Sequence, residues 1–192
     1  MLKKLVQQSR SYRRFDESYK VDKETLYQLI ELARLIPSAA NMQPLKYLLS
    51  TSADHNEKIF SCLTWAAALK DWAGPAPGER PTAYIVILGD NSICKEINWD
   101  HGIAAQTIML GAAELGLGGC IFSSVKRARL RELLQIPEQY SILLVLALGK
   151  PAEKVVITTV GEDGDTRYWR DENGVHYVPK RSVKELIFDT IT

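Results

Sequence analysis

The sequence predicts an α+β protein in which helices cover a sheet of about four strands. Two continuous apolar runs of strand length, Ala83–Leu88 and Ser141–Leu148, are expected to be buried central strands. Helical patterns precede and separate these runs. The chain has 192 residues, of which 46% are hydrophobic and 24% charged, and no internal repeat interrupts it. We therefore expect one domain over residues 1–192.

The first helix signals alternate with proline-containing loops. Residues 2–8 are expected to form a short helix or turn. Residues 22–36 repeat apolar side chains at three- and four-residue spacing, with Asp22 as the N-cap and Pro37 as the stop. The loop 38–44 then leads into a strand.

A short strand is predicted at 46–50 and a third helix at 54–72. The proline and glycine residues of 74–81 exclude regular structure there. The third helix is predicted from apolar side chains that share one side, namely Ile59, Cys62, Leu63, Ala66 and Leu69.

Residues 97–116 are predicted to form the most apolar helix of the chain. A membrane-spanning helix is not expected, because Asp100, Gln106 and Glu114 interrupt it and a span needs about 20 apolar residues. Small residues such as Gly111 would let another helix approach closely, including one from a second subunit. The other expected elements are a strand at 120–122, a basic helix at 126–134, an irregular stretch at 160–180 and an amphipathic turn at 183–187.

Charge and cysteine content exclude several classes of protein. The net charge is +1, which creates no general attraction to nucleic acid or to an anionic membrane. Cys62, Cys94 and Cys120 have no paired spacing, which argues against a disulfide framework and a zinc site. The N-terminus lacks the apolar core of a signal peptide, so a cytoplasmic location is expected.

Familiar catalytic motifs are also missing from the sequence. There is no Gly-x-x-x-x-Gly-Lys-Ser/Thr loop, and the glycines from Gly116 follow a helix and precede a strand, the reverse of a dinucleotide fingerprint. No Gly-x-Ser-x-Gly elbow surrounds Ser123 or Ser124. We assign no catalytic side chain and no metal ligand.

Four dispersed segments are each suited to part of a large planar phosphorylated ligand. Arginine forks and a serine hydroxyl, as in Arg10–Arg14, match a phosphate dianion. A simpler interpretation exists for each segment alone: a solvated basic run, a helix-to-strand turn, a helix C-cap or a surface cation pair. The segments are Arg10–Arg14, the loop with Ser38, Asn41 and Gln43, the glycines Gly118–Gly119 with the N–H groups that follow, and the pair Lys180–Arg181.

These segments, in this order, resemble the nitroreductase family of FMN-dependent oxidoreductases. The resemblance covers residues 5 to about 185. It implies a three-layer α+β fold with a mixed, mainly antiparallel central sheet. It also implies a homodimer with an extended C-terminal segment and two FMN molecules at the subunit interface. The matching stretches are Ser9–Phe15, Pro37–Pro44, Asp100 opening an Ala-rich helix, Gly116–Gly119 and Leu146–Pro151.

The resemblance further implies which residues contact FMN. The basic segment would hold the phosphate and ribityl chain, the loop would reach the flavin from the partner chain, and the segment after the glycines would donate backbone N–H groups near N5 or O4. Ser9 and Leu45 depart from the usual pattern, which has an arginine at the first position and often a tryptophan at the second. The implied contacts are Arg10, Ser11 and Arg13; Ser38, Ala39, Asn41 and Gln43; Cys120, Ile121, Phe122 and Ser123; and, for the phosphate, Lys180 and Arg181.

The implied activity is hydride transfer from NADH or NADPH to a small organic acceptor, such as a nitro compound or quinone, in two steps at one site. Such a mechanism requires no acid or base from a side chain. Arg14 is left out of the phosphate site, because neighbouring side chains of an extended segment point in opposite directions. A flavin-dependent dehalogenase, a flavin-consuming enzyme and a non-catalytic flavin-binding protein remain open as alternatives.

Overall fold

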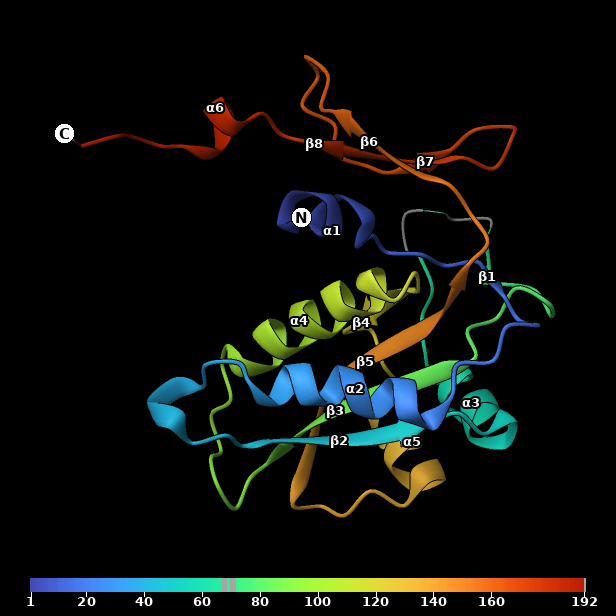
Figure 1. Ribbon diagram of the computed structural model, residues 1–192, viewed down its shortest axis with the longest axis vertical. Helices are drawn as coiled ribbons and strands as arrows, with labels where there is room; N and C mark the ends of the chain where they lie inside the picture. Colours follow the sequence, from blue (N-terminus) through green and yellow to red (C-terminus); the bar gives the residue numbers. More distant parts are fainter. Residues whose placement is uncertain (67–68, 70–71, 192) are drawn as a thin grey trace. The chain divides into compact units, whose positions relative to one another are not determined.

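The computed structural model describes residues 1–66, 69 and 72–191 (Figure 1). These residues form two compact units. The first comprises Met1–Trp65 and Gly74–Ala152, and the second comprises Ala66–Ala73 and Glu153–Thr192. The expectation of one domain over residues 1–192 stays a prediction.

A five-stranded sheet forms the centre of the first unit. The strand β5 (Tyr140–Pro151) pairs along one edge with β3 (Ala83–Asp90) and along the other with β4 (Gly118–Phe122) and β1 (Phe15–Asp16). The strand β2 (Leu45–Ser50) pairs with β3. All these pairings are antiparallel. The four predicted strands are confirmed, and each is longer than expected.

Two helices, α2 (Lys23–Arg34) and α4 (Asp100–Glu114), cover one face of this sheet (Figure 1). Every residue of β3 is buried, and alternation along the strand turns Ile85 and Ile87 toward these helices. The side chain of Asp22 accepts a hydrogen bond from Thr25 N at 2.7 Å, so the predicted N-cap of α2 is confirmed.

The contact between α2 and α4 depends on Gly111. A Cβ atom at this position would lie 2.5 Å from Cδ1 of Leu32 and 3.0 Å from Cδ2 of Leu29. The helix that approaches the small residues of α4 at Gly111 is therefore α2 of the same chain. Among the described residues, no helix is both long and apolar enough to cross a membrane.

The remaining helices of the first unit are α1 (Leu2–Gln8), α3 (Ala53–Phe60) and α5 (Arg127–Leu134). The prediction of a helix over 54–72 was wrong beyond Phe60. The backbone there pairs with a distant segment instead, because Lys126 N donates to Cys62 O at 2.9 Å and Thr64 N donates to Ser124 O at 3.1 Å. Residues 67, 68, 70 and 71 of that prediction lie outside the described part of the chain.

The second unit contains a small three-stranded sheet that the sequence did not predict. The strand β8 (His176–Lys180) pairs in parallel with β6 (Val155–Thr159) and antiparallel with β7 (Trp169–Arg170). Trp169 stacks on Tyr177, with ring centroids 5.3 Å apart. These strands are too short and polar for a clear period, so they depend on such cross-strand pairs. The predicted final turn forms α6 (Val183–Leu186), which begins with a capping box between Ser182 and Glu185.

Candidate functional site

The basic segment runs directly beside β4. Tyr12 N donates a hydrogen bond to Gly119 O at 2.9 Å, and Ser11 forms a parallel bridge with Gly119. Because backbone groups alternate between the two edges of a strand, Ile121 presents its N–H on the same edge as Gly119. The N–H groups of Cys120 and Phe122 point to β5 instead. Of the predicted donors on β4, Ile121 is therefore the one directed away from the sheet.

The arginines of the basic segment have different surroundings. Arg10 donates from Nη2 to Val6 O, while its Nε is buried and has no hydrogen-bond partner among the described residues. Arg13 donates from Nη1 to Ser11 O at 3.3 Å. Arg14 forms an ion pair with Glu79, with Nε 3.4 Å from Oε2, in line with its omission from the site. Arg10 thus retains a buried donor, one residue before the bridge of Ser11 with Gly119.

The loop Ser38–Gln43 is organised by Asp100, the first residue of α4. The hydroxyl of Ser38 donates to Oδ2 of Asp100, and Ala39 N donates to Oδ1 at 3.2 Å. Gln43 N in turn donates to Ser38 Oγ at 2.9 Å. The hydroxyl of Ser38 is therefore engaged within the protein, and it holds the loop rather than offering a free donor.

The backbone of this loop is strained. Ala40, Asn41 and Gln43 have φ angles of 48°, 54° and 52°, in the left-handed region that side chains disfavour. The side chains of Asn41 and Gln43 are exposed, and Nε2 of Gln43 donates to Asn41 O at 3.2 Å. Strain of this kind persists only where surrounding contacts impose it, and it is frequent at ligand sites.

A cavity of about 240 Å³ lies beside this loop. Burial, and to a smaller degree the charge of Asp100, raises the pKa of Tyr47 to about 12. Leu45 lines the same cavity, so the departure from the family pattern falls here. Sequence reasoning missed Tyr47, and it noted Asp100 only as the start of the Ala-rich helix and as a polar residue that argues against a membrane span. An acid in the most apolar helix was the available signal. The lining residues are Ser38, Gln43, Tyr47 and Asp100 with Ile30, Glu31, Ala33, Arg34, Ile36 and Leu45.

The glycines near β4 serve the packing of the chain itself. A Cβ at Gly118 would lie 2.4 Å from the ring of Tyr12, and one at Gly119 would lie 2.4 Å from the backbone oxygen of Ala147. Protein atoms fill the space on the Cβ side of both glycines, so the packing of the chain itself requires their small size. Gly116, with φ of 70°, ends α4 as a left-handed cap.

The other predicted residues have mixed positions. The side chain of Phe122 belongs to the core, where it packs edge-on against Trp65 at 4.6 Å, so only its backbone could reach a ligand. Cys120 is buried and Ser123 is exposed. In the second unit, Lys180 ends β8 and Arg181 lies 3.5 Å from Glu185 Oε1. The role of Lys180 and Arg181 at the phosphate stays a prediction.

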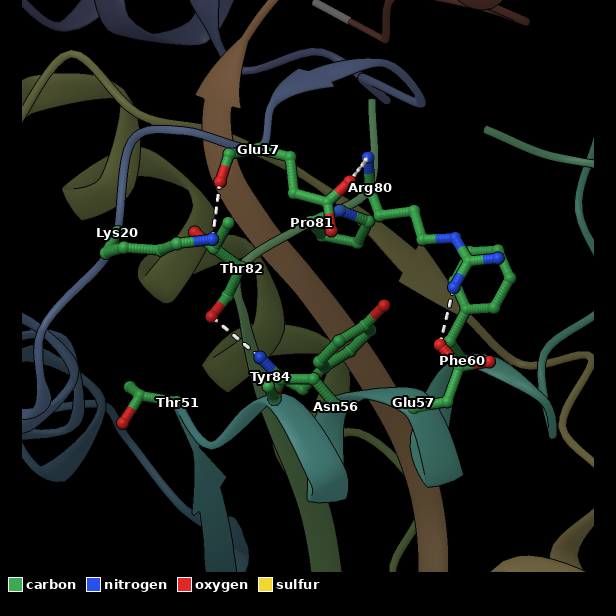
Figure 2. A pocket seen from close by; sticks show the side chains of 11 residues that line it. Glu17, Lys20, Thr51, Asn56, Glu57, Phe60, Arg80, Pro81, Thr82 and Tyr84 are labelled. Atoms are coloured by element: carbon green, nitrogen blue, oxygen red, sulfur yellow. Dashed lines mark hydrogen bonds and ion pairs between the residues drawn. The ribbon is translucent and has the colours of Figure 1, made fainter. Parts of the chain in front are cut away.

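A second pocket, of about 210 Å³, contains none of the predicted residues (Figure 2). Arg80 forms an ion pair with Glu57 there, with Nη1 2.5 Å from Oε2, and Glu17 accepts a hydrogen bond from the backbone N–H of Arg80 at 3.3 Å. Arg80 also lies over the ring of Phe60, 4.4 Å from its centroid. Tyr84 lines this pocket, and burial raises its pKa far above the usual range. We do not assign a site here.

A comparison with known sequences identifies the family of this chain. A sequence model described as the nitroreductase family matches residues 6–150. The chain belongs to the nitroreductase family. The resemblance drawn from the sequence is confirmed.

Among curated nitroreductase relatives, a protein of Archaeoglobus fulgidus is 27% identical over 159 residues, covering 79% of this chain and 86% of its own. It is provisionally named an NADH dehydrogenase/NAD(P)H nitroreductase. An oxygen-insensitive NADPH nitroreductase of Helicobacter pylori is 23% identical, covering 77% of this chain and 86% of its own. These oxidoreductase names agree with the predicted enzyme class.

Solved nitroreductase structures share the fold. An FMN-dependent nitroreductase of Clostridium difficile is 25% identical with a TM-score of 0.63, covering 78% of this chain and 87% of its own. A Bacillus subtilis structure, provisionally named a nitroreductase, has a TM-score of 0.69 at 19% identity and covers 98% of both chains. The predicted nitroreductase-like α+β fold is confirmed.

Proposed function

We propose that this nitroreductase-family chain is an FMN-dependent oxidoreductase. It takes hydride from NADH or NADPH and reduces a small organic acceptor such as a nitro compound or a quinone. The observation that carries the proposal is the hydrogen bond from Tyr12 N to Gly119 O, which aligns the basic segment with β4. Cationic groups and strand-edge donors then lie along one stretch of the first unit. The names of the relatives from H. pylori and C. difficile support the nicotinamide and the flavin respectively.

The residues present fit FMN at its phosphate end. Arg10 keeps a buried Nε without a partner among the described residues, and a buried donor left unsatisfied is costly. A phosphate oxygen is the kind of acceptor that satisfies it. We assign the phosphate to Arg10, Ser11 and Arg13, while the contacts implied for Lys180 and Arg181 in the second unit stay predictions.

The ring end would lie along β4. Bound FMN supplies the redox chemistry. Ile121 would donate its backbone N–H toward N5 or O4 of the ring, with Ser123 as the neighbouring candidate. The N–H groups of Cys120 and Phe122 are directed to β5 and are no longer proposed as donors. Such a donor stabilises the negative charge that reduction places on the ring, by about 1.5–3 kcal/mol. The loop with Ser38, Ala39, Asn41 and Gln43 would orient the ring from the other side.

We also propose that the protein is a homodimer in which the loop Ser38–Gln43 of one chain serves the flavin of the other. The exposed position of Asn41 and Gln43 supports this arrangement, because both can reach beyond their own chain. Light scattering on a sizing column would give a mass of two chains. A mass of one chain for the flavin-loaded protein would contradict the dimer.

The activity is tested by anaerobic titration. Purified protein loaded with FMN is expected to be yellow, to bleach on addition of NADH or NADPH, and to recover its colour with a nitro compound or a quinone. Protein that takes up no FMN would contradict the proposal. Yellow protein that nicotinamide does not bleach would indicate a binding protein, and analysis of the products would reveal a dehalogenase or a flavin-consuming enzyme.

A further inference from the structure

Asp100 is a buried carboxylate with an unusual set of partners. It is 5% exposed, lies at the start of the apolar helix α4, and is absent from the ion pairs recorded among the described residues. Its charge is instead stabilised by hydrogen bonds from Ser38 and Ala39 and by the N-terminal end of α4. A buried charge without a cation is costly, so this arrangement needs a reason.

The bonds of Asp100 extend to both ends of the strained loop. Ala39 N is held directly by the carboxylate, and Gln43 N is held through the hydroxyl of Ser38. The left-handed residues Ala40 and Asn41 lie between these two anchors, and Gln43 is itself left-handed. The carboxylate thus anchors both ends of a loop whose middle closes its own turns, with Asn41 N donating to Ser38 O at 2.9 Å and Met42 N donating to Ala39 O at 3.1 Å.

We propose that Asp100 is the positioning residue of the flavin site: its carboxylate holds the loop Ser38–Gln43 in the conformation that binds the flavin ring. This inference rests on the proposed FMN function. Asp100 acts through Ser38 and Ala39 and does not itself contact the cofactor. Both donors need an acceptor, and a carboxylate offers one oxygen to each. The amide of asparagine has the same size but turns an NH₂ group toward one of them.

A second buried aspartate provides a matched control. Asp90, at the end of β3, is 6% exposed, and its Oδ1 accepts from Ser92 Oγ at 2.6 Å and from Ser92 N at 3.0 Å. It therefore has the same chemistry as Asp100, a buried carboxylate that holds a serine hydroxyl and a backbone N–H. Its recorded side-chain bonds go to Ser92 and not to the loop.

The experiment compares FMN binding by Asp100→Asn and Asp90→Asn. Fluorescence titration of the apoproteins is expected to show an FMN Kd at least tenfold higher for Asp100→Asn, and within twofold of the unsubstituted chain for Asp90→Asn. The midpoint potential and visible spectrum of bound FMN should shift only in Asp100→Asn. A general loss of stability would move neither property of the bound flavin, so these readouts separate positioning from folding.

Hydrogen exchange supplies a readout without flavin. In the apoprotein, the amides of Ala39 and Gln43 are expected to exchange faster in Asp100→Asn than in Asp90→Asn. If Asp100→Asn cannot be purified, Ser38→Ala decides the question, because it removes the link to Gln43 and keeps the carboxylate. Its FMN Kd should rise at least threefold.

Two results would overturn the inference. One is an Asp100→Asn protein whose FMN affinity lies within twofold of that of the unsubstituted chain and whose flavin potential is unchanged. If Asp100→Asn cannot be purified, the corresponding result is a Ser38→Ala protein with unchanged FMN affinity. The other is an unsubstituted chain that takes up no FMN. The second result would contradict the proposed function as a whole, and the exchange rates of Ala39 and Gln43 would still report whether Asp100 anchors the loop.

Discussion

The strand β4 and the loop Ser38–Gln43 both fix a stretch of backbone, but by opposite means. β4 is bonded along one edge to β5 and along the other to Tyr12, and its glycines have no room for another atom. The loop has no ladder. It contains three left-handed residues, closes its own backbone turns, and is anchored at both ends by hydrogen bonds that lead to a single carboxylate. β4 is held by strand pairing and close packing, and the loop is anchored by hydrogen bonds to side chains.

The difference predicts which kind of substitution should destabilise each segment. A side chain added at Gly119 cannot be accommodated, because the interior is close-packed and the nearest neighbour is the backbone oxygen of Ala147. The loop tolerates changes of size at its exposed tip but depends on an acceptor at its base. Substitutions at the two segments should therefore differ in sign, size and readout.

The largest effect is expected at Gly119. In Gly119→Ala the new Cβ would meet Ala147 O at 2.4 Å and Leu148 Cδ2 at 2.8 Å, so overpacking should lower the free energy of unfolding by about 3 kcal/mol. Denaturant unfolding measures it. Gly102→Ala is the control: Gly102 is an exposed position of α4 where an added Cβ would meet no other part of the protein within 4 Å, and the change should stabilise the helix by about 0.5–1 kcal/mol. Equal effects at the two glycines would refute the packing argument.

Arg10 tests the basic segment beside β4 as a ligand site. Loss of a charge-assisted hydrogen bond of about 2 kcal/mol in Arg10→Ala should weaken FMN binding roughly thirtyfold. Arg14→Ala is matched in residue type and segment, and it should change FMN affinity little, because Arg14 is paired with Glu79. Fluorescence titration of both apoproteins measures the difference. Equal losses would mean that only the general charge of the segment matters.

Alkaline pH should disturb the conformation of the loop Ser38–Gln43 more than that of β4, because Tyr47 lines the cavity beside the loop. The pKa of Tyr47 is about 12 in the folded protein and about 10 when unfolded, so its contribution to stability is complete below pH 10 and is lost as the pH rises toward 12. Tyr47→Phe should reduce the fall in the free energy of unfolding between pH 10 and 12, and the fall in FMN affinity as the pH approaches 12. Burial also raises the pKa of Tyr84, so Tyr84→Phe should reduce the fall in stability alone. Identical pH profiles for FMN binding in the two variants would mean that ionisation of Tyr47 does not affect the loop.

The smallest effect is expected at Ala40. Glycine adopts a φ of 48° without strain, and relief of that strain should stabilise the folded protein by about 1 kcal/mol. Glycine also raises the conformational entropy of the unfolded chain, which lowers the stability by about half of that amount. Ala40→Gly should therefore raise the free energy of unfolding by about 0.5 kcal/mol and leave FMN affinity nearly unchanged. Thermal unfolding measures the gain, and a clear loss of stability would show that the backbone here is not strained.

Sequence reasoning predicted the elements with strong local patterns. The apolar runs of β3 and β5 and the spacing and cap of α2 are properties of neighbouring residues, so they were readable. The early end of α3 was not, because it depends on the bond of Cys62 with Lys126. For the site, the order of the segments predicted the family, and the structure brings Ser11 and Gly119 together. The role of Asp100 could not be read, because its partners lie 61 and 62 positions away.

That separation has a consequence for the order of folding. The bond between Ser38 and Asp100 spans 62 positions, so the loop can acquire its conformation only after α4 has docked on the sheet. Its native contacts should be absent from the transition state and form last. During refolding, recovery of flavin binding should therefore lag behind recovery of the sheet.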